Sequence, residues 1–305
     1  MRRILVASRT FGYGAGDENL KQLFDKYHLN AQFLSLKEAD QRLSEYEGLI
    51  LGTDKFTRHH FESSKSLRVI CKYGVGTDNI DMDAAETHGV KILNLPGINC
   101  NAVAEMALGL MVSAARRIAE GDRLIRKGGW EQLMGFSLKG KTLGIIGTGA
   151  IGMTLAQMVI GFEMKILAYD IKQNETLSNY GGEYVIFKDL LRKSDFITLH
   201  VPFNNKTFHL LGEKEFTQMK KEAILINTSR GPIIDEKALC DALKAKKLAG
   251  AGLDVFEVEP PFEREILKLD NVVCTPHISA YTHETLRRMD EASVTAVSRA
   301  LEDQS

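Results

Sequence analysis

Three side chains in the second half of the chain, Arg230, Glu259 and His277, could together bind and protonate a small organic acid. The planar fork of an arginine can hold a carboxylate and polarise an adjacent carbonyl oxygen. Histidine is the natural acid and base near neutral pH, and a glutamate in contact with its ring would fix the tautomer and favour the imidazolium. Each residue alone is explained at least as well as an ordinary loop residue, so the chemistry depends on whether the fold brings the three together.

A glycine turn within residues 141–170 predicts the element around which such a site would be built. The apolar run 142–146 ends at Gly147, and Gly149 and Gly152 complete the pattern GTGAIG before an expected helix and a second apolar run. The first glycine allows a tight turn, the second lets the backbone approach a pyrophosphate, and the third brings the helix against the strand. We therefore predict dinucleotide binding; the alternative is a nucleotide-free α/β unit whose glycines only permit close packing.

Asp170 closes the second apolar run, where a carboxylate would accept hydrogen bonds from an adenosine ribose. Such a carboxylate would repel a ribose 2′-phosphate, so the sequence favours NAD over NADP. Lys172, two positions further on, keeps NADP as the less favoured alternative.

Six apolar runs after residue 141 predict the strands of a complete dinucleotide-binding sheet, at residues 142–146, 165–169, 196–199, 223–226, 250–253 and 272–274. In an open parallel sheet, ligands bind beyond the carboxyl ends of the strands, so the polar residues that follow each run should form one set. That set comprises Gly147, Gly149, Asp170, His200, Pro202, Thr228, Ser229, Arg230, Asp254, Glu259 and His277. Their convergence favours a catalytic role for the arginine, the glutamate and the histidine. His200 and Pro202 are predicted to form a wall on the adenine side.

Five shorter apolar runs in the first 95 residues predict a separate doubly wound parallel sheet, at residues 4–7, 31–34, 48–51, 69–71 and 90–93. The fourth run leads into KYGVGTDNID, residues 72–81, whose two closely spaced glycines would expose backbone amides to a carboxylate. A simple turn is an equal alternative there. The amphipathic stretch 284–301 is expected to return and cover this first sheet.

The predicted fold class is therefore α/β, with two doubly wound domains. Residues 1–98 and 281–305 are expected to form a discontinuous, flavodoxin-like substrate domain, and residues 99–280 an inserted Rossmann NAD-binding domain. A substrate cleft would lie between the hinged halves. Asn101 is expected to cap a helix that runs to about Ile118 and is apolar on nearly every face, which indicates a domain or subunit interface.

Composition and charge bound the partners and the location of the protein. With 44% hydrophobic and 26% charged residues and a formal charge of −1, the chain is typical of a soluble protein that binds neither nucleic acid nor a membrane surface. The apolar run 102–115 contains Glu105 and is too short to span a bilayer, and the N-terminal apolar stretch is too short for a signal peptide. A reducing, cytoplasmic location and no metal site are predicted from the scattered positions of Cys71, Cys100, Cys240 and Cys274.

These motifs resemble the D-isomer-specific 2-hydroxyacid dehydrogenase family, in particular its phosphoglycerate dehydrogenase-like branch. The resemblance covers nearly the whole chain, through KYGVGTDNID, NAVAE, GTGAIG, LHVPF, INTSRG, GLDVFEVEP and TPHISAYT. It implies that Arg230, Glu259 and His277 occupy the catalytic positions of the family. It also implies that Asp254 contacts the nicotinamide carboxamide and that the chain forms a homodimer through about residues 99–140.

The resemblance extends to the residues expected to touch each ligand. The cofactor set that it implies is Gly147, Gly149, Ala150, Ile151, Gly152, Asp170, His200, Val201, Pro202, Thr207, Thr228, Ser229, Arg230, Asp254 and His277. The substrate set is Lys72, Tyr73, Gly74, Val75, Arg230 and His277, with the amides of Gly74, Val75 and Gly76 directed at the substrate carboxylate.

We therefore predict an NAD-dependent oxidoreductase that acts on CH–OH donors and transfers hydride between the nicotinamide and a D-2-hydroxy acid/2-oxo acid pair. One candidate pair is 3-phosphoglycerate and phosphohydroxypyruvate; the alternative is a glyoxylate or hydroxypyruvate reductase. From a different class, a non-catalytic NAD(H)-sensing binding protein also has this fold. Glu259 argues against a formate dehydrogenase, a relative that has glutamine at this position.

Overall fold

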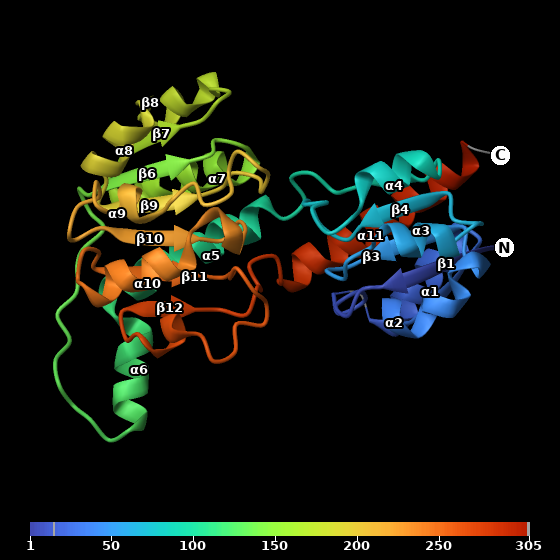
Figure 1. Cartoon of the computed structure of the whole chain (residues 1–305), viewed down its shortest axis with the longest axis horizontal. Coiled ribbons are helices and arrows are strands. Elements are labelled where there is room, and N and C mark those ends of the chain that lie inside the picture. The colour runs from blue at the N-terminus through green and yellow to red at the C-terminus, as the bar shows by residue number, and fades with distance from the viewer. Residues whose placement is uncertain (15, 304–305) are drawn as a thin grey trace. The chain divides into compact units, whose positions relative to one another are not determined.

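The computed structural model describes residues 1–14 and 16–303, and within them the chain forms two compact units (Figure 1). The first unit comprises Met1–Asn99 and Ala280–Ser305, and the second comprises Cys100–Ser279. The second unit is thus inserted into the sequence of the first, and each has its own parallel sheet and core. The assignment of the first unit to substrate binding stays a prediction.

The sheet of the first unit is parallel and has the strand order β2-β1-β3-β4-β5 of flavodoxin-like folds. Its strands are β1 (Arg2–Ala7), β2 (Leu29–Phe33), β3 (Gly48–Leu51), β4 (Val69–Lys72) and β5 (Lys91–Leu93). One face is covered by α1 (Asp17–Lys26) and α11 (His283–Glu302). The other face is covered by α2 (Leu36–Ala39), η1 (Asp40–Glu45), α3 (Arg58–Ser63) and α4 (Met82–Thr87). Both faces are covered, and the central strands β3 and β4 are buried at every position, which is why their sequences are almost continuously apolar.

Helix α11 brings the end of the chain back onto the first sheet, as predicted from the periodicity of residues 284–301. Thr282 caps the helix, because its hydroxyl accepts a hydrogen bond from the Thr285 amide at 3.2 Å. The apolar side chains of Leu286, Met289 and Val294 pack into the same core as the residues of β1 and β4. This packing places the buried polar residues of α11 next to the carboxyl end of β4.

The second unit contains a parallel sheet in the order β12-β11-β10-β9-β6-β7-β8, the Rossmann arrangement with one added strand. Its strands are β6 (Thr142–Ile146), β7 (Lys165–Tyr169), β8 (Gly182–Tyr184), β9 (Phe196–Leu199), β10 (Ile224–Asn227), β11 (Gly250–Leu253) and β12 (Val272–Cys274). The strand order reverses between β6 and β9, and this switch point is where an open α/β sheet binds its ligand. The predicted α/β class with two doubly wound sheets is confirmed.

The prediction of six strands in this sheet was wrong, because the described residues contain β8 as a seventh. Strand β8 is three residues long, begins with Gly182 and exposes Glu183, so it has no apolar run that sequence inspection could detect. It pairs with β7 alone, at the edge of the sheet. Tyr184 at its end becomes important for the site described below.

Helices cover both faces of the second sheet (Figure 1). On one face lie α5 (Cys100–Arg116) and α7 (Ala150–Met158), the latter followed by η2 (Val159–Phe162). On the other lie α8 (Phe187–Lys193), α9 (Glu213–Phe216) and α10 (Glu236–Lys244). The short turns η3 (Glu175–Tyr180), η4 (Gly231–Ile233) and η5 (Glu265–Lys268) complete the connections. None of the helices in residues 1–14 and 16–303 is long and apolar enough to cross a membrane.

The helix predicted from Asn101 to about Ile118 differs from the structure at both ends. Helix α5 begins at Cys100, so Asn101 lies inside its first turn and does not cap it. The helix ends at Arg116, because Arg117 adopts a left-handed φ of 54°, and α6 (Ile118–Arg126) starts in a new direction. Helix α6 has no buried residue, whereas α5 packs on β10, β11 and α7.

Candidate active site

The glycine turn after β6 has the geometry of a phosphate-binding turn. Gly147 has a φ of 98°, and a Cβ there would lie 2.7 Å from the backbone of His200. A Cβ on Gly152 would lie 2.1 Å from the carbonyl oxygen of Gly147, which explains how closely α7 approaches the turn. Gly149 has no heavy atom within 4 Å of its Cβ position, so the space in front of it is open. The N-terminus of α7, at Ala150 and Ile151, faces this region with its amides and dipole.

Asp170 at the end of β7 is held in place by backbone and side-chain donors. Its Oδ2 accepts hydrogen bonds from the Thr148 amide at 2.6 Å and the Thr148 hydroxyl at 3.2 Å, and its Oδ1 accepts one from the Lys172 amide at 3.0 Å. The hydroxyl of Tyr184 on β8 donates to Thr148 Oγ1 at 2.7 Å. The carboxylate is therefore oriented by the glycine turn itself and by the edge strand. Lys172 contacts Asp170 through its backbone amide. This contact neither favours nor disfavours the 2′-phosphate of NADP.

The loop after β9 carries four of the predicted cofactor residues. His200 lies directly beside Gly147, and its Nε2 is 2.9 Å from Thr198 Oγ1. Burial lowers the pKa of His200 to about 3, so the ring is neutral and suits a wall better than an acid or base. Val201 follows it, and the carbonyl of Pro202 accepts a hydrogen bond from the Thr207 hydroxyl at 2.7 Å. Thr207 therefore closes the loop onto itself.

The turn after β10 positions Thr228, Ser229 and Arg230 around a buried asparagine. Asn227 Oδ1 accepts hydrogen bonds from the amide and hydroxyl of Ser229 at 3.0 and 2.8 Å, and its Nδ2 donates to the Arg230 carbonyl at 2.9 Å. Arg230 Nη1 in turn donates to the Ser229 carbonyl at 2.8 Å. The Thr228 side chain is 7% exposed, and its Oγ1 is buried without a hydrogen-bond partner among the described residues.

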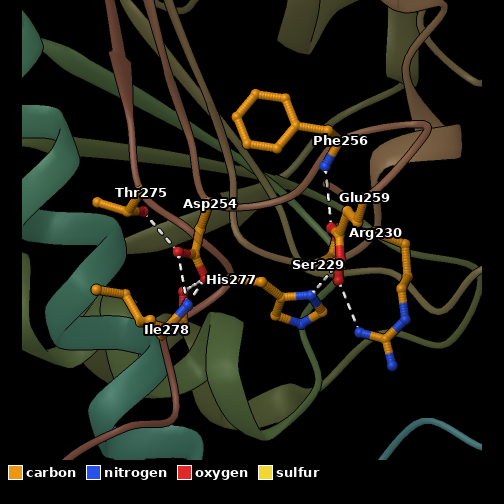
Figure 2. A network of polar contacts seen from close by, with 9 residues as sticks. Ser229, Arg230, Asp254, Phe256, Glu259, Thr275, His277 and Ile278 are labelled. Carbon is orange, nitrogen blue, oxygen red and sulfur yellow. Dashed lines mark hydrogen bonds and ion pairs between the residues drawn. The ribbon is translucent and has the colours of Figure 1, made fainter. Parts of the chain in front are cut away.

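Gly231 allows the arginine turn to approach the loop that carries Glu259. A Cβ on Gly231 would lie 1.9 Å from the carbonyl carbon of Phe256, so only glycine fits there. The Phe256 amide donates to Glu259 Oε1 at 3.1 Å, which folds the glutamate back over its own loop. This close contact brings Arg230 and Glu259, from two different strand ends, into one group (Figure 2).

Glu259 and His277 form a direct pair: His277 Nδ1 is 2.7 Å from Glu259 Oε2 (Figure 2). Their side chains are 39% and 37% exposed for the histidine and the glutamate, so both can be reached from solvent. Burial raises the pKa of Glu259, but the hydrogen bond and charge of His277, the Phe256 amide and the charge of Arg230 together lower it below its ordinary value. The glutamate is therefore ionised at neutral pH and orients the ring of His277.

Asp254 forms the buried base of the loop that carries His277. Its carboxylate, 0% exposed, accepts from the Thr275 hydroxyl at 2.5 Å, from the amides of Ile278 and Ser279 at 2.9 Å each, and from the Ser279 hydroxyl. The His277 amide donates to the Asp254 carbonyl at 2.9 Å, and His277 itself has a left-handed φ of 54°. Asp254 thus holds the strained backbone on which the histidine stands. A contact from its side chain to a nicotinamide stays a prediction.

In the first unit, the predicted substrate residues lie at the end of β4 and in the turn after it. The side chains of Lys72 and Tyr73 are 6% and 7% exposed, and Lys72 Nζ donates to the Gly52 carbonyl. Gly74 has a φ of 141°, and its amide donates to the Lys72 carbonyl at 2.9 Å, so this amide is already engaged. The Asn94 side chain donates to the Val75 carbonyl at 2.7 Å. The structure therefore turns the side chains of Lys72 and Tyr73 inward, whereas residues 74–76 are partly exposed.

Comparison with known proteins now adds an independent observation. The model of the D-isomer specific 2-hydroxyacid dehydrogenase, NAD binding domain, matches residues 108–279, more than half of the chain. That segment contains the glycine turn and the strand ends that carry Arg230, Glu259 and His277. The chain belongs to the D-isomer specific 2-hydroxyacid dehydrogenase family. It is therefore an oxidoreductase, its second unit is the NAD-binding domain of that family, and the resemblance seen in the sequence is confirmed.

The chain is similar to family members that are named for different activities. A glyoxylate reductase of Thermococcus litoralis is 47% identical over 262 residues, which are 82% of this chain and 79% of that protein. A D-3-phosphoglycerate dehydrogenase of Archaeoglobus fulgidus is 43% identical over 256 residues, which are 82% of this chain and 49% of that protein. The structure of D-lactate dehydrogenase from Aquifex aeolicus, complexed with NAD and lactic acid, has a TM-score of 0.85 at 28% identity, covering 99% of this chain and 96% of that one.

The residues of the second unit fit the NAD of this family. Open space in front of Gly149 and amides at the start of α7 would suit the pyrophosphate, and the oriented Asp170 would suit the adenosine ribose. The buried, unpartnered hydroxyl of Thr228 offers a further hydrogen bond at the end of β10. Among residues 1–14 and 16–303, no group of three or more His, Cys, Asp or Glu side chains is arranged to hold a metal ion.

Sequence reasoning missed three residues that shape these sites, Thr148, Tyr184 and Asn227, and it also missed Asp290, a buried carboxyl group of the first unit. Thr148 and Asn227 lie inside motifs that were recognised, so their position beside known ligand residues was a usable signal. Tyr184 lies on the undetected strand β8, and Asp290 lies in a helix that reads as ordinary and amphipathic. Nothing in the local sequence of the last two indicates a role.

Proposed function

We propose that the chain interconverts a short D-2-hydroxy acid and its 2-oxo acid with NAD as the cofactor. The observation that carries this proposal is the His277–Glu259 pair, which stands with Arg230 at the carboxyl edge of the NAD-binding sheet. An oriented imidazole provides a proton donor and acceptor, and the arginine provides a planar binding group for a carboxylate. The roles of the three residues are part of the proposal.

The chain's own residues would act as follows in the direction of reduction. Arg230 binds the carboxylate of the 2-oxo acid and polarises the adjacent carbonyl oxygen. Glu259 accepts a hydrogen bond from Nδ1–H of His277, which orients the imidazolium so that its Nε2–H can donate a proton to the carbonyl oxygen. The bound nicotinamide supplies the hydride for the carbonyl carbon. After the transfer His277 is neutral and keeps its Nδ1 proton, which remains hydrogen-bonded to the Glu259 carboxylate, and the product is the 2-hydroxy acid.

We further propose that the substrate is a small, unphosphorylated 2-oxo acid such as glyoxylate or hydroxypyruvate. The Thermococcus litoralis glyoxylate reductase supports this, and the inward, nearly buried Lys72 leaves no exposed cation from that side chain for a phosphate. The Archaeoglobus fulgidus relative favours phosphohydroxypyruvate as a second candidate.

The four cysteines are free thiols, which supports a reducing, cytoplasmic location.

The first experiment follows the loss of NADH absorbance with glyoxylate, hydroxypyruvate, pyruvate and phosphohydroxypyruvate, with NADPH in parallel. We expect turnover of the unphosphorylated acids with NADH. Turnover of phosphohydroxypyruvate alone would replace the proposed substrate with the second candidate. NADH binding without turnover of any acid would contradict the catalytic proposal and favour a sensing role.

The variant His277→Ala tests the role of the histidine. Loss of a positioned acid and base should lower kcat by about 10²- to 10⁴-fold while NADH still binds. His59→Ala is the matched control, because His59 is exposed on α3 in the other unit. Retention of most activity in His277→Ala would remove the histidine from the mechanism.

We also propose that the chain forms a homodimer through about residues 99–140. Helix α6 and the segment after it expose Ile118 and Ile125 (53% each), Trp130 (80%) and Met134 (86%), a concentration of apolar surface typical of an interface. Sedimentation velocity should give twice the mass of the chain. The double variant Trp130→Glu/Met134→Glu should be monomeric and folded, whereas a monomeric wild type would contradict the proposal.

A further inference from the structure

Asp290 is a fully buried carboxyl group on α11, in the interior of the first unit. Its side chain is 0% exposed and lies among apolar neighbours on the same helix face, including Leu286, Met289 and Val294. An apolar residue would satisfy the packing at this position without the cost of burying a polar group. The presence of a carboxyl group therefore calls for an explanation in its contacts.

The two oxygens of Asp290 have different surroundings. Oδ1 accepts a hydrogen bond from the Tyr73 hydroxyl at 2.6 Å and another from the Gly12 amide at 3.1 Å. Oδ2 is buried without a hydrogen-bond partner among residues 1–14 and 16–303. Through Oδ1, Asp290 thus joins α11 to the end of β4 and to the loop after β1. The hydrogen-bonding capacity of Oδ2 remains unused.

The Tyr73 side chain is held from two directions. Its ring packs against Phe11 with centroids 5.4 Å apart, and its hydroxyl lies 3.3 Å from the Leu286 carbonyl as well as near Asp290. Its amide donates to the Leu51 carbonyl at 2.8 Å, so both ends of the residue are restrained. Any shift of Tyr73 would be transmitted directly to the next residue, Gly74.

The turn after Tyr73 is restrained on its other side as well. The Gly74 carbonyl accepts from the Leu95 amide at 2.9 Å, and the Val75 carbonyl accepts from the Asn94 side chain at 2.7 Å. No hydrogen bond from the amides of Val75 and Gly76 is present among the described parts of the chain. These two amides are the donors left for a ligand, and two adjacent donors suit a carboxylate.

We propose that Asp290 is a positioning residue for substrate binding: through Tyr73 it fixes the turn whose Val75 and Gly76 amides bind the carboxylate of the acid. The inference rests on the proposed function for the identity of the ligand. Asp290 acts through Tyr73 and does not touch the substrate. Burial raises the pKa of the Asp290 carboxyl, only partly opposed by the hydrogen bonds from Tyr73 and Gly12, which agrees with a group retained for its geometry.

The test compares four variants of the full chain: Asp290→Ala, Asp290→Asn, Tyr73→Phe and, as matched control, Val294→Ala. Val294 is 0% exposed on the same helix, and its apolar side chain makes no hydrogen bond to Tyr73. Its truncation should therefore destabilise the unit and leave the hydrogen bond between Tyr73 and Asp290 in place. We expect Asp290→Ala and Tyr73→Phe to raise KM for the 2-oxo acid about tenfold, with kcat and the KM for NADH nearly unchanged. Asp290→Asn retains an acceptor oxygen for Tyr73 and should restore most of the affinity.

Hydrogen–deuterium exchange at residues 74–77 provides a readout that needs no turnover. We expect faster exchange there in Asp290→Ala than in Val294→Ala, with Asp290→Asn close to wild type. An active wild type in which Asp290→Ala behaves like Val294→Ala would overturn this inference alone. A wild type without turnover would overturn the proposed function, and unchanged exchange at 74–77 in Asp290→Ala would still overturn the positioning role by itself.

Discussion

Among the residues whose burial the structure describes, each unit buries one aspartate completely, and the two carboxyl groups differ in the donors that surround them. Asp254 in the second unit accepts four hydrogen bonds from Thr275, Ile278 and Ser279. Asp290 in the first unit accepts two on one oxygen and none, from the described residues, on the other. Both are 0% exposed, so the difference lies in the donors that surround them and not in the extent of burial.

This difference shows what a buried carboxyl group can do in a protein. A carboxyl group with donors on both oxygens has its buried polar atoms satisfied and can organise a loop, as Asp254 does beneath His277. A carboxyl group with donors on one oxygen is costly as an anion and readily binds a proton. We therefore expect Asp254 to hold the loop of His277 rigidly, and Asp290 to orient Tyr73 through a single hydrogen bond.

Removal of the two carboxyl groups gives the largest expected contrast. Asp254→Ala leaves the donors of Thr275, Ile278 and Ser279 unpaired and should destabilise the second unit by about 3–5 kcal/mol. Asp290→Ala strands fewer donors and should cost the first unit about 1–2 kcal/mol. Scanning calorimetry of both variants measures the two losses, and equal losses would remove the contrast.

Isosteric amides sharpen the comparison. In Asp254→Asn the new NH₂ group must face donors, so we expect a loss of about 2 kcal/mol and a lower kcat from the displaced His277 loop. In Asp290→Asn the NH₂ group can take the place of Oδ2, which has no donor to lose, and the cost should be below about 1 kcal/mol. Denaturant unfolding monitored separately in each unit by hydrogen exchange distinguishes the two outcomes.

The pH dependence of stability should have opposite signs for Asp290 and Glu259. The pKa of Asp290 is raised, chiefly by burial, so its contribution is full below the ordinary value of 3.8 and is lost as pH rises through the raised pKa. The pKa of Glu259 is lowered, so its contribution is full above the ordinary value of 4.5 and is lost as pH falls through the lowered pKa.

The charged and titratable groups around Asp290 are Tyr73, which donates to it, and Glu291, whose charge also raises its pKa. Thermal unfolding of the wild type, Asp290→Asn and Glu259→Gln across acid and neutral pH tests both signs. We expect the wild type to lose stability relative to Asp290→Asn as pH rises, and relative to Glu259→Gln as pH falls. Parallel curves for the wild type and Asp290→Asn would show that the Asp290 proton is not linked to folding.

The partly exposed carboxylate of Glu257 provides the smallest expected effect. His209 Nε2 is 2.5 Å from Glu257 Oε1, with 34% and 23% of the two side chains exposed. Water screens this pair, so Glu257→Gln should cost about 0.5–1 kcal/mol and lower kcat only slightly. A loss as large as that of Asp254→Ala in calorimetry would show that burial is not what separates these carboxylates.

Features carried by contiguous residues could be predicted from the sequence. The apolar runs, the GTGAIG turn and the amphipathic stretch at 284–301 lie within single elements, because strand and helix periodicity are local properties. Strand β8 was missed because three residues at a sheet edge have no periodicity to detect. The end of α5 at Arg116 was missed because the residue in the left-handed conformation is Arg117, whereas glycine is the usual sequence signal for such a helix end.

Parts of the candidate site were open to prediction for the same reason. Arg230, Glu259 and His277 each follow a strand of a parallel sheet, and such strand ends converge by topology. The residues that contact and position each of these three side chains could not be predicted from the topology of the sheet. The support of His277 by Asp254 depends on a side chain 23 positions earlier in the sequence, and the approach of Arg230 to Glu259 depends on the missing Cβ of Gly231.

The sequence by itself determined the α/β class, the dinucleotide-binding turn and the residues at the strand ends, because each of these follows from local patterns and from the fixed topology of parallel sheets. Only the tertiary structure decided that Asp290 meets Tyr73 and Gly12, residues 217 and 278 positions away. A hydrogen bond between side chain and backbone is specified by position in space to a fraction of an ångström. That precision comes from the packing of α11 on the first sheet, which no local pattern encodes.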